Sequence, residues 1–110
     1  LNNWFPGRRM DADPRYQEKS VDVLAARAKR AFLDYTPLRF DPVDPERVYR
    51  SYRYGPTVEV FLLDARSYRG RNTRNDQPEP GPDTPFFGSD QIRWLQWKLK
   101  ASRATWKVIA

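Results

Sequence analysis

One run of apolar residues dominates the hydrophobic pattern of this chain. Nearly every position from Val58 to Leu63 is apolar, and only Glu59 interrupts the run. Because successive side chains of a strand point to opposite faces of a sheet, this run predicts a strand covered on both faces. We therefore expect it to lie in the middle of a sheet.

The end of this predicted strand is the first place to look for chemistry. The run stops at Asp64 and is followed by Arg66 and Arg69. In open α/β sheets, ligands lie beyond the carboxyl ends of the strands, so these side chains are candidates for a site. The alternative interpretation is structural, in which Asp64 and Arg66 pair with each other or cap a turn.

A helix is expected before this strand. Apolar residues recur there at three- and four-residue steps, which is typical of a helix that packs on a sheet; they are Val21, Leu24, Ala28, Ala31, Phe32 and Tyr35. Either Asp13 with Pro14 or Ser20 can begin this helix. It should end before Thr36, because a residue that precedes proline disfavours helical geometry.

A second strand is expected over Val48–Tyr54, because this segment is rich in β-forming residues. Gly55 and Pro56 supply a turn, so the two strands should form an antiparallel hairpin. Arginine and tyrosine alternate in this segment, at Tyr49, Arg50, Tyr52 and Arg53. Such a mixture suits phosphate and base contacts in a nucleic-acid binder, but it also arises where long side chains cover one another on a sheet.

A long loop is expected over Gly70–Phe87, which holds four prolines and many polar residues. It is either a lip over a site or an excursion without function. Ser89 is then the expected N-cap of a second helix, and Trp106–Ala110 begins a strand parallel to the first. The elements predict a mixed α/β chain in the order helix, antiparallel β-hairpin, long loop, helix, strand.

Composition narrows the chemistry. The 110 residues include no histidine and no cysteine, which removes the commonest general base, thiolate nucleophiles and disulfides. No apolar run approaches the roughly 20 residues that a membrane span needs. The formal charge of +6 comes mostly from arginine, which favours a phosphate-bearing substrate or nucleic acid as partner. A basic surface that serves only solubility is the simpler alternative.

Several segments together resemble a known family. They are Asn2–Gly7, Tyr49–Gly55, Phe61–Arg69, Phe87–Gln91 with Trp94 and Leu95, and Ala104–Ile109. In this order they are similar to consecutive blocks of the PhoD-like alkaline phosphatases, and they span nearly the whole chain. The resemblance implies that residues 1–110 are a middle fragment of one catalytic domain, a larger α/β/β/α metallophosphatase sandwich.

The resemblance also implies a function. Members of that family are secreted or periplasmic phosphodiesterases and phosphomonoesterases with a calcium- and iron-dependent centre. The family's main metal ligands fall outside this chain, so the resemblance implies no complete catalytic set here. It implies that Asn2 and Asn3 lie near the metals and are candidate ligands. Because a guanidinium can hold phosphate charge, Arg66 and Arg69 are the candidates for binding substrate phosphate. Asp64 either contributes a further oxygen ligand or fastens the strand end.

Expectations for the isolated chain follow. It should not hydrolyse phosphate esters or bind calcium or iron tightly, because the remaining metal ligands lie in the rest of the catalytic domain. That remainder is its expected partner. The alternative is a small basic nucleic-acid-binding or structural domain without catalysis. That alternative requires a chain that folds independently. For a fragment, the predicted sheet has exposed edges and a face meant for absent neighbours, so we expect marginal stability or self-association.

Overall fold

The computed structural model describes residues 1–74 and 76–110. Within them the chain forms two helices and three strands, which follow the predicted order. The elements are α1 (Val21–Tyr35), β1 (Arg50–Tyr54), β2 (Val58–Leu62), α2 (Ser89–Ala101) and β3 (Trp106–Ile109). The predicted mixed α/β class is confirmed. Neither helix has the length and apolar character needed to cross a bilayer.

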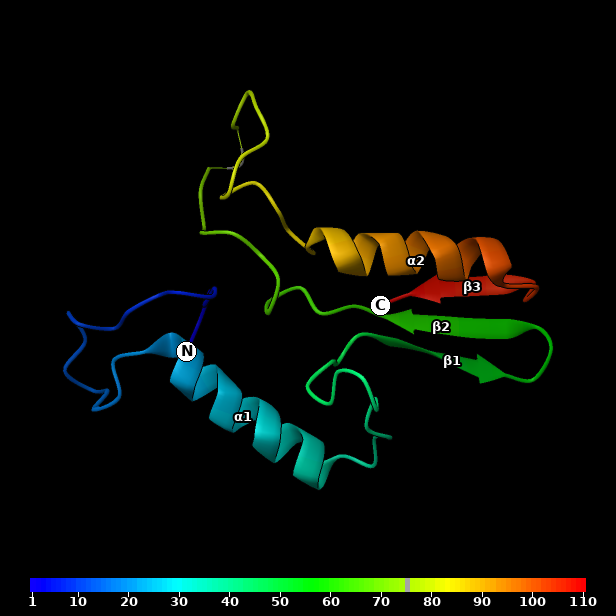
Figure 1. The fold of residues 1–110 in the computed structure, drawn as a ribbon, viewed down its shortest axis with the longest axis horizontal. Helices are drawn as coiled ribbons and strands as arrows, with labels where there is room; N and C mark the ends of the chain where they lie inside the picture. Colours follow the sequence, from blue (N-terminus) through cyan, green and yellow to red (C-terminus); the bar gives the residue numbers. More distant parts are fainter. Residues whose placement is uncertain (75) are drawn as a thin grey trace.

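The sheet has the strand order β1-β2-β3, so β2 is central as predicted. β1 pairs with β2 antiparallel, and Tyr54 lies opposite Val58 at the hairpin end. β3 pairs with β2 in parallel, with Phe61 opposite Ile109. Phe61 is fully buried. The carboxyl ends of β2 and β3 therefore lie at the same end of the sheet (Figure 1).

α1 begins at Val21, after Ser20 accepts a hydrogen bond from the Val23 backbone N–H. The alternative start at Asp13 is wrong, because the Asp13 carboxylate accepts hydrogen bonds from both the backbone and the side chain of Arg15. Asp13 is thus used in a local turn that precedes the helix. Thr36 is extended and ends α1, as expected of a residue before proline.

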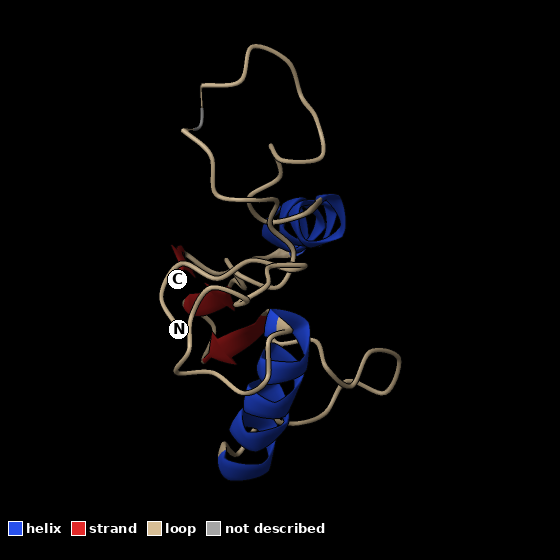
Figure 2. Ribbon diagram, turned by 90° about the vertical axis from the view of Figure 1, so that its left-hand side faces the viewer, coloured by secondary structure: helices blue, strands red, loops and turns tan. Residues whose placement is uncertain are grey.

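The expected packing of α1 on the sheet is wrong. Figures 1 and 2 show α2 lying along the strands, whereas α1 lies beyond the end of the sheet. Two residues of its predicted apolar stripe, Phe32 and Tyr35, are exposed, with 44% and 91% of their surface accessible, and Leu33 is buried instead. The spacing of apolar residues predicts a helix, but it does not identify the segment that packs against each of these residues.

The N-cap of α2 is Gly88, one residue before the predicted Ser89. Gly88 has φ 75° and ψ 152°, a region that only glycine occupies without strain. A Cβ atom at this position would lie 2.8 Å from the Tyr68 Cβ. Tyr68 in turn contacts Tyr49, whose buried ring also meets Trp94 of α2. Gly88 therefore permits the close approach of α2 to the segment that follows β2.

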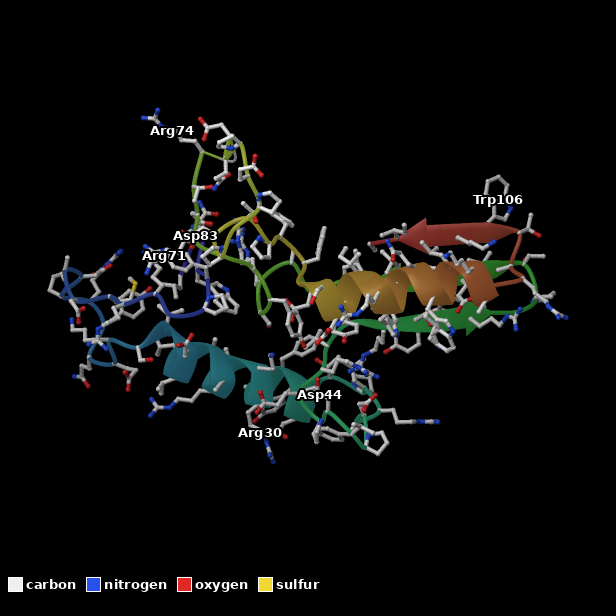
Figure 3. The ribbon with its side chains drawn as sticks, turned by 45° about the horizontal axis from the view of Figure 1, so that its top comes forward. Arg30, Asp44, Arg71, Arg74, Asp83 and Trp106 are labelled. Atoms are coloured by element: carbon white, nitrogen blue, oxygen red, sulfur yellow. The ribbon has the colours of Figure 1, made fainter. Side chains whose placement is uncertain are left out.

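Residues 70–87 form the predicted long loop, with no helix or strand among those described. Its two ends are joined, because the Gly70 N–H donates to the Pro85 carbonyl at 2.8 Å. Arg71 and Asp83 face each other near this base at 3.9 Å, and Arg74 lies at the far end of the loop (Figure 3). The loop is thus an excursion with a closed base.

The chain exposes more surface than a compact domain of its size. Its accessible surface is 8351 Å², against roughly 6,300 Å² for a folded monomer of this mass. Its radius of gyration is 16.5 Å, against roughly 13 Å for a compact domain. Every residue of β3 is exposed, and the Trp106 side chain projects from the sheet (Figure 3). The described residues therefore build only part of a core.

We predict that the isolated chain is marginally stable or self-associates, because β3 presents an unpaired edge with exposed apolar side chains. Sedimentation velocity and a proton–nitrogen NMR correlation spectrum would measure this. Concentration-dependent association or collapsed peaks are expected. A monomer with dispersed peaks and cooperative unfolding would contradict the prediction.

We also predict that Gly88→Ala destabilises the full-length protein by about 1–3 kcal/mol, because alanine is strained at this backbone conformation and its Cβ meets Tyr68. Gly81→Ala is the matched control. Gly81 has no atom within 4 Å of an added Cβ, so its substitution should change stability by less than about 0.5 kcal/mol. Urea denaturation would compare the two variants, and equal effects would refute the role of Gly88.

Candidate functional site

The turn that follows β2 is built around the Asp64 carboxylate. One of its oxygens, Oδ1, accepts hydrogen bonds from the backbone N–H groups of Arg66 and Ser67, each at 2.9 Å. The carboxylate therefore caps the turn. The Arg66 guanidinium extends away from Asp64, so the two side chains do not form the ion pair that was one alternative. This turn aims Arg66 at another part of the chain.

Arg66 reaches the N-terminal segment, more than 60 residues earlier in the sequence. Its Nη1 donates to the Trp4 carbonyl at 3.3 Å, and its Nη2 lies 3.5 Å from Oδ1 of Asn3. Arg8 contacts the same segment, because its Nη1 donates to the carbonyls of Asn2 and Asn3. The structure thus brings together three of the candidate residues, Asn2, Asn3 and Arg66.

Asn3 occupies a special backbone position in this cluster. Its φ is 50°, and asparagine adopts this left-handed conformation more readily than most residues. The Asn72 side chain also donates to the Asn3 carbonyl, at 2.6 Å. The segment 2–4 is therefore held by donors from both Arg8 and the start of the long loop. Sequence reasoning missed Arg8 and Asn72, because no local pattern distinguishes them from other polar loop residues.

The cluster is electropositive. In the described part of the chain, the hydrogen-bond partners of the Arg8 and Arg66 guanidiniums are carbonyl and amide oxygens, not carboxylates. Their charges are therefore not neutralised by ion pairs. Guanidinium groups in this condition suit an incoming phosphate, whose oxygens accept charge-assisted hydrogen bonds.

The structure places Arg69 outside this cluster. Its guanidinium lies over the Phe86 ring, 4.8 Å from the ring centroid. Its Nε is buried, and within the described residues it has no hydrogen-bond partner. Arg69 therefore packs against the end of the long loop, while Arg66 faces the asparagines.

Gln91 is a buried polar residue that the sequence analysis missed. It lies in the first turn of α2 and only 1% of its surface is exposed. Its Oε1 accepts from the Asp64 N–H at 2.7 Å, and its Nε2 donates to the carbonyls of Asp64 and Phe87. The sequence does hold one signal of this burial: Gln91 lies one turn before Leu95 and therefore on the apolar side of the helix.

The donor set of this chain does not by itself fit a calcium or iron centre. Among residues 1–74 and 76–110, no three acidic side chains gather where they could hold a metal. Asn3 Oδ1, a candidate ligand, faces the Arg66 guanidinium. Hard cations require several converging oxygens, so further ligands would have to come from elsewhere.

The alternation of arginine and tyrosine in the hairpin serves internal contacts at two of its four positions. Tyr49 is buried between Tyr68 and Trp94. Arg50 donates to three backbone carbonyls, those of Arg39, Arg47 and Val48. Neither side chain is presented to a nucleic acid, so the geometry favours the structural interpretation of this segment.

Tyr68 follows the turn, and its phenol is partly buried near Asp64 and Tyr49. Burial raises the pKa of Tyr68 to about 12, and the nearby Asp44, Tyr49 and Asp64 act in the same direction. Arg47 partly opposes them. The phenol is therefore neutral under alkaline conditions, in which an ordinary tyrosine with a pKa of about 10 ionises.

We predict that Tyr68 titrates near pH 12 in the folded protein and near pH 10 in urea. Because the folded pKa is the higher one, stability from the neutral phenol is complete below about pH 10 and is lost as the pH rises towards 12. Tyrosinate absorbance of the full-length protein and its Tyr68→Phe variant would measure this. If the substitution removes a component near pH 10 from the folded protein, the prediction is wrong.

Comparison with known proteins adds an independent finding. The family model of the PhoD-like phosphatases matches residues 1–110. A solved structure, that of PhoD, is similar with a TM-score of 0.64 and 27% sequence identity. The match covers 98% of this chain and 22% of that protein, so the chain spans about a fifth of its length. No curated protein matches the chain.

Proposed function

Because the chain belongs to the PhoD-like phosphatase family, we propose that it is part of the catalytic domain of a metal-dependent phosphatase that hydrolyses phosphate esters. The small share of PhoD that the match covers supports a role as one segment of a larger domain. The observation that carries the proposal is the contact of Arg66 with Trp4 and Asn3 beyond the carboxyl end of β2, next to Asn2, whose carbonyl accepts from Arg8. This is where ligands lie in open α/β sheets.

In this proposal Arg66 binds a phosphate oxygen of the substrate. Its Nη2 lies 3.5 Å from Asn3 Oδ1, a long contact that a phosphate oxygen can replace with a stronger one. A guanidinium already in place also stabilises the charge that develops on the phosphoryl group during hydrolysis. Arg8 adds a second positive charge next to Asn2 and Asn3.

The proposal assigns calcium and iron to the full-length enzyme. Such cations, when bound, polarise phosphoryl oxygens and supply hydroxide. Because the described residues lack a complete donor set, we propose that the main ligands lie outside residues 1–110. Asn2 and Asn3 then lie at the edge of the centre, and the isolated chain is inactive. Hydrolysis by the purified chain alone would contradict this part of the proposal.

The proposal extends to the class of enzyme and its location. It includes both phosphodiesterase and phosphomonoesterase activity, and export to the periplasm or the medium. These follow from the resemblance of the sequence blocks to the family. Assays of the full-length enzyme with a phosphate diester and a monoester, and fractionation of the host cells, test them separately.

We predict that Arg66→Ala in the full-length enzyme raises KM for a phosphate ester about 10-fold or more, because a charge-assisted hydrogen bond contributes about 1.5–3 kcal/mol. Inhibition by inorganic phosphate should weaken by a similar factor. Steady-state kinetics would measure both effects. Arg27→Ala, at an exposed position on α1, is the control. Unchanged KM and phosphate inhibition in Arg66→Ala would reject the assignment.

A further inference from the structure

Gln91 is the most deeply buried polar side chain of the described residues and has no role in the proposed chemistry. A buried amide is costly unless its donors and acceptor are satisfied, and glutamine is seldom fully buried. All three of its hydrogen bonds go to backbone groups, two on Asp64 and one on Phe87. This concentration of bonds marks a position where backbone placement matters.

The Gln91 amide continues the pairing of β2 beyond the end of the sheet. The last backbone bond on the β3 side is that of the Leu63 N–H, which donates to the Ala110 carbonyl at 2.8 Å. At the next residue, Asp64, the N–H and the carbonyl both bond to the amide of Gln91. One side chain thus accepts and donates as a neighbouring strand would.

The effect reaches Arg66 through a short series of contacts. With its backbone held by Gln91, Asp64 places its carboxylate under the N–H groups of Arg66 and Ser67. The Arg66 guanidinium then reaches Trp4 and Asn3. The bond from Gln91 to Phe87 fixes the end of the long loop at the same point.

We infer that Gln91 is a positioning residue, which orients Arg66 for phosphate by holding the backbone of Asp64. The inference deepens the proposed function and rests on it for the ligand of Arg66. In the described part of the chain, the hydrogen bonds of Gln91 go to Asp64 and Phe87 and not to Arg66 or the asparagines. Gln91 therefore acts through the turn. Glutamine is required because the site presents one N–H and two carbonyls to the same side chain.

The test uses Gln91→Met in the full-length enzyme, since methionine has a similar length and lacks the amide. Gln96→Met is the matched control, because Gln96 is exposed on the same helix. Hydrogen exchange of the peptide that spans residues 63–69 should become about 10-fold faster in Gln91→Met only. KM for a phosphate ester should rise about 3- to 10-fold, with a smaller change in kcat.

A double-mutant cycle with Arg66→Ala separates positioning from general destabilisation. If Gln91 acts through Arg66, Gln91→Met should change KM by less than about 2-fold once Arg66 is removed. The inference is overturned if the KM increase of the double variant equals the product of the two single-variant increases. It is also overturned if hydrogen exchange of residues 63–69 is unchanged in Gln91→Met. If Gln91→Met does not fold, Gln91→Glu takes its place under the same criteria, since it keeps the acceptor and loses both donors.

The two proposals can fail separately. If Arg66→Ala leaves KM unchanged, phosphate binding by Arg66 is refuted whatever Gln91→Met does. Faster exchange of residues 63–69 in Gln91→Met would then still support the hold of Gln91 on the turn. If Arg66→Ala raises KM while Gln91→Met alters neither exchange nor KM, only the role of Gln91 is refuted.

Discussion

The pairing of β2 along both of its edges is the constraint on which the rest of the structure depends. β1 holds one edge in antiparallel register, and β3 holds the other in parallel register. Phe61 of β2 is fully buried, and a shift of one residue would turn it to the opposite face of the sheet, so the burial of Phe61 fixes the register of the strand. Asp64 therefore leaves the sheet at a fixed point.

The N-terminal segment depends on a different kind of interaction. It is joined to α1 by the Gly7 N–H, which donates to Asp22, and by the Val21 N–H, which donates to the Arg8 carbonyl. Arg66 and Asn72 then join this unit to the turn after β2. Polar contacts between side chains and backbone, more than a shared apolar core, thus set the distance between the asparagines and the sheet.

The elements and their order could be predicted because the relevant patterns are local. The apolar run of β2, the helical spacing in α1 and the turn at Gly55 each depend on neighbouring residues. Contacts between distant segments carry no such pattern. Asn3 and Arg66 are 63 residues apart in the sequence, so no local pattern predicts their contact. Gln91 escaped notice because periodicity records apolar positions. Which side of α1 is buried also depends on segments that are distant in the sequence, and the spacing of apolar residues within the helix does not identify them.

The closed base of the loop 70–87 has an evolutionary consequence. Gly70 bonds to Pro85, and it lies so near the Asp83 backbone that a side chain could not fit between them. Because the two ends are tied, residues can be added between them without moving either end. Doubling the length of a flexible loop costs only about 0.6 kcal/mol of closure entropy. This loop is therefore where relatives can diverge in length, and where a probe or epitope tag can be inserted with least disturbance to the fold.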